Sequence, residues 1–419
     1  MSWSTKTSLY IGKARQLSGF FVFTLRGDDD SPSVKFSYFC LMDNFPASLQ
    51  QKLQQRESAD ALRQLPVHSN RIDFSSNDYL GFSKSAAIFE AAHQILVRQG
   101  IVQNGATGSR LISGNYPLYE ETERQIAKFH QAPSALLFNS GYDANVGFFS
   151  AVPQRNDVIL FDELSHASIR DGIRLSAAKS FKFAHNDLDE LRSLIQKHRD
   201  NVTEIYIATE SVFSMDGDSP QLEQMVLLAQ EYGCYLILDE AHALGVFGDC
   251  GEGLAQPFGD RIFARIMTFG KGLGCHGAAI IGAEDLRKYL VNFARSFIYT
   301  TGLPPHSLAT IAAAYQHLQN DAVARQALRD NINFFNREKL RLGLKPLFVY
   351  GKSAIQSAII PGNEKVKSVA LQLQQQGFEV KAILSPTVPV GQERLRICLH
   401  SYNTETEMSG LLDALQKLL

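Results

Sequence analysis

Short apolar runs alternate with stretches of helical periodicity between residues 135 and 282. The most regular runs are Val158–Phe161, Glu204–Thr209, Cys234–Asp239 and Ala264–Phe269. One intervening segment, after possible capping residues at 186–187, spaces its leucines along one helix face. Strands that are apolar throughout and separated by helices are typical of a mainly parallel sheet covered on both faces. The pattern therefore predicts an α/β domain with its ligand site at the carboxyl ends of the strands.

The chain changes character after residue 309, where longer helical stretches begin. The tail then predicts a strand, a helix over Glu364–Gln376, a second strand, a turn over Ser385–Gly391, a third strand over Leu395–Leu399 and a final helix. This order predicts a smaller α+β domain. We expect four parts: an N-terminal extension (1–41), an N-terminal segment (42–95), a large domain (96–308) and a small C-terminal domain (309–419).

Residues 1–41 mix polar and aromatic side chains without a sustained period, and a helical pattern begins after Met42. Two interpretations are open. Either Met42 is the natural start and the first 41 residues are an upstream extension, or these residues form an ordinary N-terminal arm that packs on the body. The mass of the mature N-terminus would distinguish them.

The overall charge excludes some classes of function. Lys and Arg number 41 against 43 Asp and Glu, which argues against a broad basic surface for nucleic acid. The five cysteines match neither a zinc nor a redox spacing, so we expect free thiols and a cytoplasmic location. No apolar run reaches the roughly 18 residues that a membrane span requires. A specific local site must therefore carry the function.

Two short motifs resemble nucleotide-binding signatures. The residues 239–242 spell the DEAH of a helicase family, which requires a phosphate loop of the form G-x-x-x-x-G-K-[ST] earlier in the chain. The only Gly-Lys-Ser lies downstream at 351–353, and Pro346 stands where the first glycine belongs. The glycines of 270–274 do not have the spacing of a dinucleotide loop. A helicase and a dinucleotide enzyme are both excluded.

Residues with catalytic chemistry follow several of the predicted strands. In chain order they are Ser140, Gly141, Tyr142, His166, Asp239, His242, Thr268 and Lys271. A pyridoxal phosphate (PLP) enzyme needs such a set. A mobile lysine forms an imine with the aldehyde, a carboxylate keeps the pyridine nitrogen protonated, and a flat side chain stacks on the ring. Backbone N–H groups at a helix start, with hydroxyls, suit the phosphate. Asp239 ends an apolar strand, where a carboxylate is costly to bury unless it meets a cation.

Each of these residues has a common structural explanation when it is taken singly. Lys271 could be a solvated surface lysine and Asp239 a helix cap. The two histidines could be hydrogen-bonded core or capping residues, and Ser140 and Thr268 could be turn residues. Their order along the chain, each near a strand end, favours the cofactor site over these separate explanations.

Longer motifs around these residues resemble one enzyme family. They are SSNDYLG (75–81), GSRLISGN (108–115), SHAS (165–168), ESVFSMDGD (210–218), DEAHALGVFG (239–248) and TFGKGLG (268–274). Together they look like the α-oxoamine synthases, and the likeness runs from about Phe45 to the C-terminus, leaving 1–41 outside. The resemblance implies a fold type I PLP-dependent transferase, similar to aspartate aminotransferase. Such a transferase has a mainly parallel seven-stranded sheet in the large, PLP-binding domain and a small α+β domain.

The resemblance also implies roles for individual residues. Lys271 would bind the cofactor as an imine, Asp239 would pair with its ring nitrogen and His166 would stack on its ring. The other cofactor contacts would come from Ser140, Gly141, Tyr142, Ser214, His242, Thr268 and, across a homodimer interface, Thr300 or Thr301. Asn77 and Arg396 match positions that hold the amino-acid carboxylate, and a guanidinium suits that bidentate task. No metal is implied.

The implied reaction joins an amino acid to an acyl thioester with loss of CO2. Arg63, in a helical segment, and Thr387, in SPTVPVG, resemble substrate-side residues of the biotin-pathway member, which uses L-alanine and a pimeloyl thioester on CoA or on an acyl carrier protein. A sister enzyme remains open: a glycine C-acetyltransferase, a serine palmitoyltransferase-like enzyme or an autoinducer synthase. A non-catalytic PLP-binding relative is the alternative from a different class, although the lysine, aspartate and stacking histidine that it would have lost are all present.

Overall fold

The computed structural model describes residues 45–63, 65, 70–320 and 322–419. They belong to two compact units, of which the first ends at Pro66 and the second begins at Val67. The predicted extension 1–41 and the proposed start at Met42 lie outside the described residues and stay predictions. Within the first unit, α1 (Ala47–Ser58) is a helix whose residues are all exposed.

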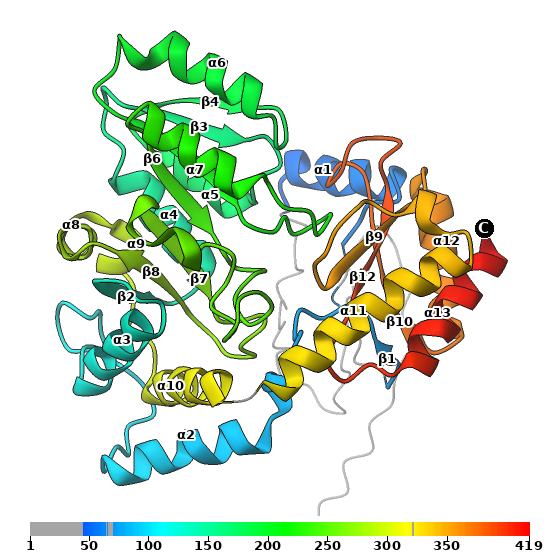
Figure 1. Ribbon diagram of the computed structural model, residues 1–419, viewed down its shortest axis with the longest axis horizontal. Coiled ribbons are helices and arrows are strands. Elements are labelled where there is room, and N and C mark those ends of the chain that lie inside the picture. Colours follow the sequence, from blue (N-terminus) through cyan, green and yellow to red (C-terminus); the bar gives the residue numbers. More distant parts are fainter. Residues whose placement is uncertain (1–44, 64, 66–69, 321) are drawn as a thin grey trace, which may run out of the picture. The chain divides into compact units, whose positions relative to one another are not determined.

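A seven-stranded sheet forms the centre of the second unit, with the order β2-β8-β7-β6-β5-β3-β4 (Figure 1). Its strands are β2 (Ser134–Phe138), β3 (Val158–Asp162), β4 (Lys179–Phe183), β5 (Ile205–Glu210), β6 (Tyr235–Asp239), β7 (Ala264–Thr268) and β8 (Ala278–Gly282). Only the two pairs that β8 makes, with β2 and β7, are antiparallel. The predicted α/β class and the mainly parallel seven-stranded sheet are confirmed.

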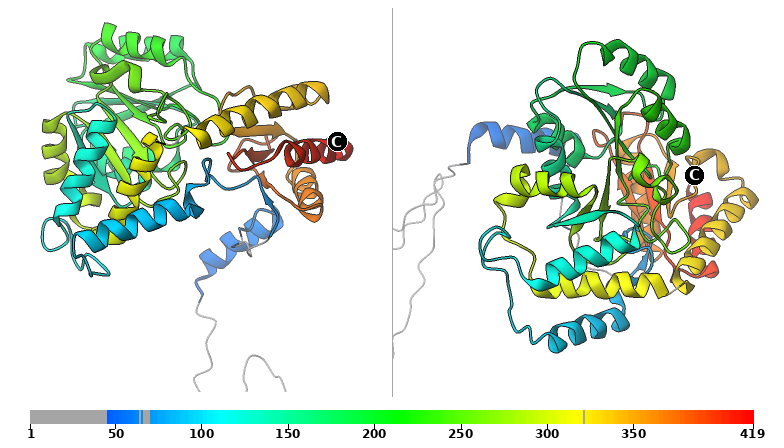
Figure 2. Two further views of the ribbon diagram at one scale, coloured as in Figure 1. Left: turned by 60° about the horizontal axis from the view of Figure 1, so that its bottom comes forward. Right: turned by 60° about the vertical axis from the view of Figure 1, so that its left-hand side comes forward.

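Side chains alternate between the two faces of the sheet, because successive residues of a strand point in opposite directions. In β5, Tyr206 and Ala208 pack with α4 (Gly141–Ala151), α5 (Ala167–Leu175) and α8 (Glu284–Phe293). Ile205 and Ile207 join a second cluster with α6 (Leu188–Arg199) and α7 (Leu222–Glu231) on the other face. Figure 2 shows helices on both sides of the sheet. Both faces are therefore removed from water, as the uninterrupted apolar strands predicted.

Three helices continue the core beside β2. They are α2 (Ala86–Arg98), α3 (Pro117–Phe129) and α10 (Pro305–Asn320), and α10 packs against the other two. The short helix α9 (Arg295–Ile298) lies against α4. The predicted boundary at 308–309 falls inside α10, and the division of this unit into a large and a small domain stays a prediction.

A second, antiparallel sheet of order β11-β12-β9 lies toward the C-terminus. It consists of β9 (Ile355–Ile359), β11 (Lys381–Ile383) and β12 (Arg394–Cys398), with helices α11 (Val323–Arg341), α12 (Asn363–Gln375) and α13 (Glu405–Leu418) around it. β1 (Ile72–Asp73) pairs in parallel with β10 (Phe378–Glu379). Short 3-10 segments occur at Phe82–Lys84, Gln256–Arg261 and Lys345–Leu347, the second of them kinked at Gly259. The predicted tail helix Glu364–Gln376 corresponds to α12, shifted by one residue.

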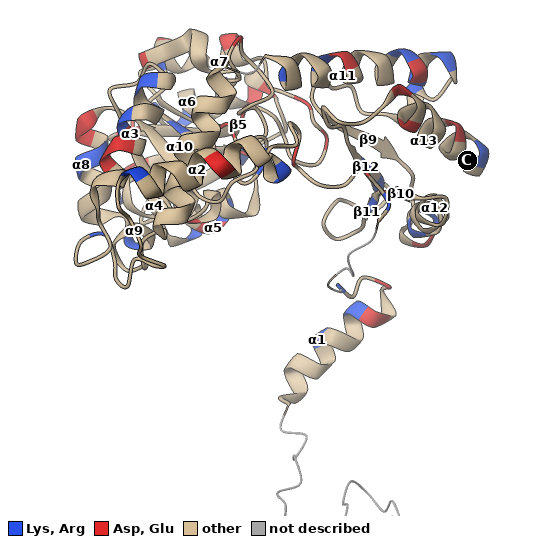
Figure 3. Ribbon diagram, turned by 90° about the horizontal axis from the view of Figure 1, so that it is seen from below, with Lys and Arg blue, Asp and Glu red and all other residues tan. Residues whose placement is uncertain are grey.

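Charged residues of both signs lie along the outer helices, as Figure 3 shows for α8 and α11. This mixture agrees with the net charge of −2. Among the described residues, no helix combines the length and apolar character needed to cross a membrane.

Candidate active site

The carboxyl ends of three central strands bring charged residues together. β5 ends at Glu210 and β6 at Asp239, and these two residues are aligned across the parallel pair. β7 lies beside β6 and is followed closely by Lys271. Because neighbouring parallel strands end at one edge, two carboxylates and one amine meet there, at the place where ligands bind in such sheets.

Lys271 follows β7 in a glycine-containing turn. Its Nζ lies 2.8 Å from Nε2 of His242, which is itself 4% exposed. Burial lowers the pKa of Lys271 to about 8, although the carboxylates of Asp239 and Glu210 oppose that change. Burial, and then the nearby lysine, also hold the pKa of His242 well below its ordinary value. The lysine therefore loses its proton much more readily near neutral pH than an ordinary lysine, and its uncharged form is the nucleophilic one.

Asp239 is only 5% exposed, and its hydrogen-bond partners are neutral. Its Oδ2 accepts from Nδ2 of Asn145 on α4 (2.8 Å), and its Oδ1 accepts from the backbone N–H of Ala241 (2.8 Å). These bonds fix the direction of the carboxylate without neutralising it. A buried carboxylate held in this way suits a cationic ring nitrogen. Asn145 was not among the predicted residues.

Glu210 was also missed, although it opens the motif ESVFSMDGD. It is 2% exposed, and its Oε1 accepts a hydrogen bond from the backbone N–H of His166 (2.6 Å). Burial, together with the neighbouring Asp239, raises the pKa of Glu210 to about 8. The sequence signal that could have identified Glu210 is an acidic residue at the end of an apolar strand, and the same signal identified Asp239.

His166 stands at the start of α5 as its capping residue. Its Nδ1 lies 2.8 Å from Oγ of Ser168 and accepts from the backbone N–H of the same residue (3.2 Å). The imidazole is thereby fixed by its Nδ1 edge, and the residue is exposed. Burial of part of the ring, and then the charge of Lys271, lower the pKa of His166, so the neutral imidazole is favoured.

Arg396 on β12 meets two of the predicted residues. Its Nε donates to the backbone oxygen of Ser214 (2.7 Å), and its Nη2 donates to Oδ1 of Asn77 (2.9 Å). Its Nη1 lies 2.9 Å from Sγ of Cys398. The guanidinium is 8% exposed. Among the residues that the structure describes, no carboxylate pairs with this buried cation, so it suits an incoming carboxylate, the task predicted for Asn77 and Arg396.

The start of α4 forms the other end of the site. The Ser140 hydroxyl caps this helix by accepting from the N–H of Asp143 (3.0 Å). A Cβ atom on Gly141 would lie 2.2 Å from Oγ1 of Thr268, so only glycine allows the helix to approach β7 this closely. Nearby, Nδ2 of Asn139 donates to Thr300 Oγ1 (3.0 Å) and to the backbone oxygen of Thr301 (2.7 Å). These N–H groups and hydroxyls at the start of an 11-residue helix suit a phosphate.

Three predicted residues are not part of these contacts. The Tyr142 side chain is 48% exposed and its phenol donates to Oδ2 of Asp171 (2.8 Å). Thr387 is exposed in the loop between β11 and β12. Arg63 is exposed within the first unit, after α1. Their roles stay predictions.

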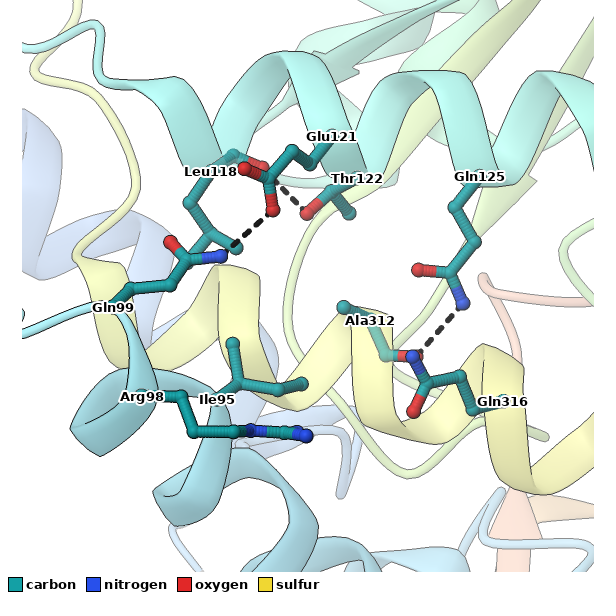
Figure 4. A pocket seen from close by; sticks show the side chains of 9 residues that line it. All are labelled: Ile95, Arg98, Gln99, Leu118, Glu121, Thr122, Gln125, Ala312 and Gln316. Atoms are coloured by element: carbon teal, nitrogen blue, oxygen red, sulfur yellow. Dashed lines mark hydrogen bonds between the residues drawn. The ribbon is translucent and has the colours of Figure 1, made fainter.

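A separate pocket lies between α2, α3 and α10, and has a volume of about 230 Å³ (Figure 4). The polar groups in it bond to the protein: Gln99 Nε2 donates to Glu121 (2.7 Å) and Gln125 Nε2 to the backbone oxygen of Ala312 (3.0 Å). None of the nine residues that line it belongs to the predicted site. The strand-end cluster, and not this pocket, is the candidate active site.

Comparisons with known proteins identify the family of the chain. A family model for class I and II aminotransferases matches residues 69–415. A curated 8-amino-7-oxononanoate synthase from Emericella nidulans is 43% identical over 404 residues, covering 90% of this chain and 95% of that protein. A putative 8-amino-7-oxononanoate synthase from Geobacillus kaustophilus is 40% identical over 349 residues, covering 82% of this chain and 87% of that protein.

Solved structures give the same grouping. The 8-amino-7-oxononanoate synthase from Francisella tularensis has a TM-score of 0.70 at 31% identity, and the match covers 83% of this chain and 97% of that one. A serine palmitoyltransferase from Sphingomonas wittichii has a TM-score of 0.80 at 25% identity, covering 90% of this chain and 98% of that one. The chain therefore belongs to the class I and II aminotransferase family and, within it, to the α-oxoamine synthases, which are PLP-dependent acyltransferases.

Proposed function

We propose that this protein catalyses the PLP-dependent condensation of L-alanine with a pimeloyl thioester, which gives 8-amino-7-oxononanoate, CO2 and free thiol for biotin synthesis. The observation that supports it most strongly is the 43% identity to a synthase of that name over 90% of the chain. The clustering of Lys271 and Asp239 with a buried, carboxylate-binding arginine at one sheet edge supports the same reaction.

The residues of the site fit the cofactor at each of its functional groups. Asp239 would hold the ring nitrogen, with the face of His166 available to the ring. His242 and Ser214 would make polar contacts. The phosphate would meet the start of α4 and the hydroxyls around it, contributed by Ser140, Gly141, Tyr142, Thr268, Thr300 and Thr301. When bound, PLP supplies an aldehyde that links to amines and a ring that stabilises negative charge on the adjacent carbon.

The protein's own groups would carry the proton transfers and the orientation of substrate. Lys271 takes the proton from the α-carbon of alanine with its neutral Nζ, and later returns a proton to the same carbon. Arg396 and Asn77 bind the alanine carboxylate until it leaves as CO2. Asp239 keeps a proton on the ring nitrogen, so that charge at the α-carbon is stabilised electrostatically. The new carbon–carbon bond joins the α-carbon to the thioester carbonyl, and the thiol leaves.

Arg63 and Thr387 would contact the acyl substrate. Each residue is exposed in its own unit, so each side chain is accessible to a substrate. The carrier of the pimeloyl group is either CoA or acyl carrier protein, and these two differ in whether a protein partner must dock. We place the reaction in the cytoplasm on the evidence of the cysteine pattern.

We also propose that the protein acts as a homodimer with its sites at the interface. Val102 and Ile112 are 90% and 86% exposed, although both are apolar. Their loop is tied to the segment that carries Thr300 and Thr301, because the N–H of Gly302 donates to the backbone oxygen of Gly108 (2.9 Å). An exposed apolar surface next to the phosphate end of the site supports an interface there with a second copy of the chain. Light scattering should give the mass of a dimer.

A long-chain acyl enzyme of the serine palmitoyltransferase type is the second candidate. It is favoured by one observation, the TM-score of 0.80 to a serine palmitoyltransferase against 0.70 to the Francisella synthase. Fold likeness at 25% identity carries less substrate information than 43% identity to a curated relative.

The test is a matrix of glycine, L-alanine and L-serine against acetyl, pimeloyl and palmitoyl thioesters, scored by thiol release. We expect alanine with pimeloyl thioester to give the largest kcat/KM. A best pair of serine with palmitoyl thioester, or glycine with acetyl thioester, would replace this function by that of the sister enzyme. If none of the substrate pairs released thiol, the result would favour the non-catalytic relative.

A further inference from the structure

A continuous line of hydrogen bonds joins the reactive lysine to the carboxylate-binding arginine. Lys271 Nζ lies 2.8 Å from His242 Nε2, and the other ring nitrogen, Nδ1, lies 2.7 Å from the hydroxyl of Tyr79. That hydroxyl donates to Oδ1 of Asn77 (3.2 Å), which also accepts from Nη2 of Arg396 (2.9 Å). Tyr79 is fully buried, at 0% exposure, and stands at the middle of the line.

The donors and acceptors of this line determine where its protons lie. The atom of Asn77 that faces Arg396 must be the amide oxygen, because a guanidinium only donates. When the Tyr79 hydroxyl donates its hydrogen bond to that oxygen, its own oxygen must accept one from His242. In this state the imidazole proton of His242 is on Nδ1. The Nε2 lone pair of His242 consequently points at Lys271, which suits a charged, donating ammonium.

The opposite arrangement suits an uncharged lysine. If the phenol turns its proton toward Nδ1, the imidazole carries its proton on Nε2, and this proton needs the lone pair of a neutral amine. In this state the Asn77 oxygen loses the bond from Tyr79 and keeps the bond from Arg396. A charged lysine therefore requires one direction of the hydroxyl, and only an uncharged lysine permits the other.

We propose that Tyr79 is a positioning residue that sets the tautomer of His242 according to the charge on Lys271. Through its second bond it links that charge to Asn77 and Arg396, so that the occupancy of the carboxylate site and the protonation of the lysine influence each other. The inference rests on the proposed function for the role of the arginine, but the linkage itself exists in the protein without substrate.

Other charged groups surround the lysine, and they must be the same in the wild type and in the variant that is compared with it. Asp239 from β6, Glu210 from β5, and Arg396 and Cys398 from β12 act on Lys271, and His166 from the start of α5 acts on His242. A change of Tyr79 to phenylalanine leaves every one of these in place. It removes one oxygen atom and keeps the buried ring.

The experiment measures the charge of Lys271 in the apoenzyme. PLP is added to the PLP-free protein between pH 6 and 10, and the growth of the visible band of the lysine–cofactor imine is followed. The rate rises as the lysine loses its proton, and we expect a midpoint near 8 in the wild type. In Tyr79→Phe, His242 is no longer held in the tautomer that accepts a hydrogen bond from the charged lysine, so the charged form is less stable. We expect the midpoint to fall by about 0.5 to 1 pH unit and the rate at pH 7 to rise about threefold to fivefold. A damaged site would be slower, not faster.

Tyr315→Phe is the matched control. Its hydroxyl also bonds a buried histidine, with 3.1 Å between the Tyr315 oxygen and Nε2 of His130, but this pair lies in the core between α10 and α3. The same atom is removed from the same kind of pair, and the midpoint should stay at the wild-type value. In a His242→Gln background, Tyr79→Phe should add no further shift, because the effect acts through the histidine.

A second measurement observes His242 directly in the wild-type protein. Nitrogen-15 spectra of histidine-labelled apoenzyme, with His242→Gln to assign the signal, should show the Nδ1–H tautomer of His242 below pH 8 and the Nε2–H tautomer above it. One tautomer at all pH values would overturn the inference, as would an unchanged midpoint in Tyr79→Phe or an equal shift in Tyr315→Phe. If wild-type apoenzyme formed no visible band, the proposed function would fail, whereas the nitrogen-15 spectra of the PLP-free protein would still decide this inference.

Discussion

Lys271 combines opposing influences that a single residue rarely meets. Burial favours its neutral form, whereas Asp239 and Glu210 favour its charged form, and the net result is a pKa of about 8. The lysine is therefore available in both states within the physiological range. A residue that must first be a nucleophile and then carry a proton benefits from that balance.

Lys271→Ala should abolish thiol release and the visible band that PLP gives with the protein. The reason is that the variant has no amine to link to the aldehyde and no base at the α-carbon. Absorption spectra and turnover with alanine and pimeloyl-CoA measure both losses. Lys288→Ala is the control, because that lysine has a side chain 70% exposed and pairs with Asp285 on α8, away from the site. Retention of the band in Lys271→Ala would contradict the assignment of this lysine.

The sequence predicted the charged residues of the site better than their partners. Lys271 and Asp239 stand in motifs whose chemistry is visible in the letters. Tyr79 lies in SSNDYLG, where an aromatic residue is as typical of a core as of a site, and in the structure it serves both purposes. Asn145 lies mid-helix with no motif of its own, and only the packing of α4 against the strand ends brings it to Asp239. Such partners depend on distance in space, which one sequence does not contain.

At the scale of elements, strand position followed from the apolar runs. The four strongest runs match β3, β5, β6 and β7 to within one residue at each end. β4 was missed because Lys179–Phe183 is a polar edge strand with only its last residue buried. β8 was missed because the short AAIIG run does not alternate, and periodicity alone cannot distinguish a short apolar run from a segment of buried helix. Edge position and antiparallel pairing are properties of the sheet, not of the segment.

The loop that follows β6 is held by a buried ion pair. Glu240 accepts from Nε and Nη2 of Arg265 on β7, at 3.1 and 2.7 Å, and from the N–H groups of Leu254 and Ala255. Glu240→Ala should lower the free energy of unfolding by about 3–5 kcal/mol, because it leaves a buried guanidinium uncompensated. Chemical denaturation measures the change. Arg124→Ala, which breaks an exposed pair with Glu120, should cost less than about 1 kcal/mol; equal losses would refute the distinction.

His185 connects the ends of β3 and β4 to the 211–218 loop. Its ring nitrogens lie 2.9 Å from Asp162 and 2.8 Å from Asp218. Burial opposes protonation, but these two carboxylates raise the pKa of His185 to about 9, above its ordinary 6.5. The native state therefore binds the proton more tightly than the unfolded chain, and the stabilisation is complete below about pH 6.5 and lost as pH rises through 9.

The corresponding test compares wild type with His185→Gln across pH. The difference in thermal midpoint should be largest near pH 6 and should shrink between pH 8 and 10. The reason is that only the wild type has a histidine whose proton is held more tightly in the native state than in the unfolded chain. The contribution at its maximum is about 3 kcal/mol, from a pKa difference of about 2.5. A difference that is constant from pH 6 to 10 would show that the histidine acts without its charge.

At the scale of the whole molecule, the 211–218 loop connects the central sheet with the small C-terminal sheet. Arg394 on β12 pairs with Asp216, Ser357 on β9 donates to the backbone oxygen of Met215, and Arg396 donates to that of Ser214. Arg396, the arginine that we propose binds the substrate carboxylate, is thus held in place by a loop of the large sheet. Movement between the two sheets would change the orientation of the guanidinium.

Asp216→Ala should therefore affect substrate binding more than chemistry. Loss of the pair with Arg394 loosens the loop beside Arg396, and we expect KM for the amino acid to rise roughly three- to tenfold with a smaller change in kcat. Steady-state kinetics at saturating thioester measure both constants. Glu231→Gln, in the exposed pair with Arg192, should leave both unchanged. A fall in kcat at constant KM would place the role of Asp216 elsewhere.

The order of the sheet has a consequence for the newly made chain. β2 is the first strand of the seven to be synthesised, yet its only neighbour is β8, about 140 residues later. At the pace of a ribosome this interval is on the order of ten seconds. During that time the apolar segment Ser134–Phe138 has no strand to pair with and could associate with other nascent chains. Because β2 is covered only when β8 pairs with it, a chaperone that binds apolar segments would help most before residue 282 has emerged from the ribosome.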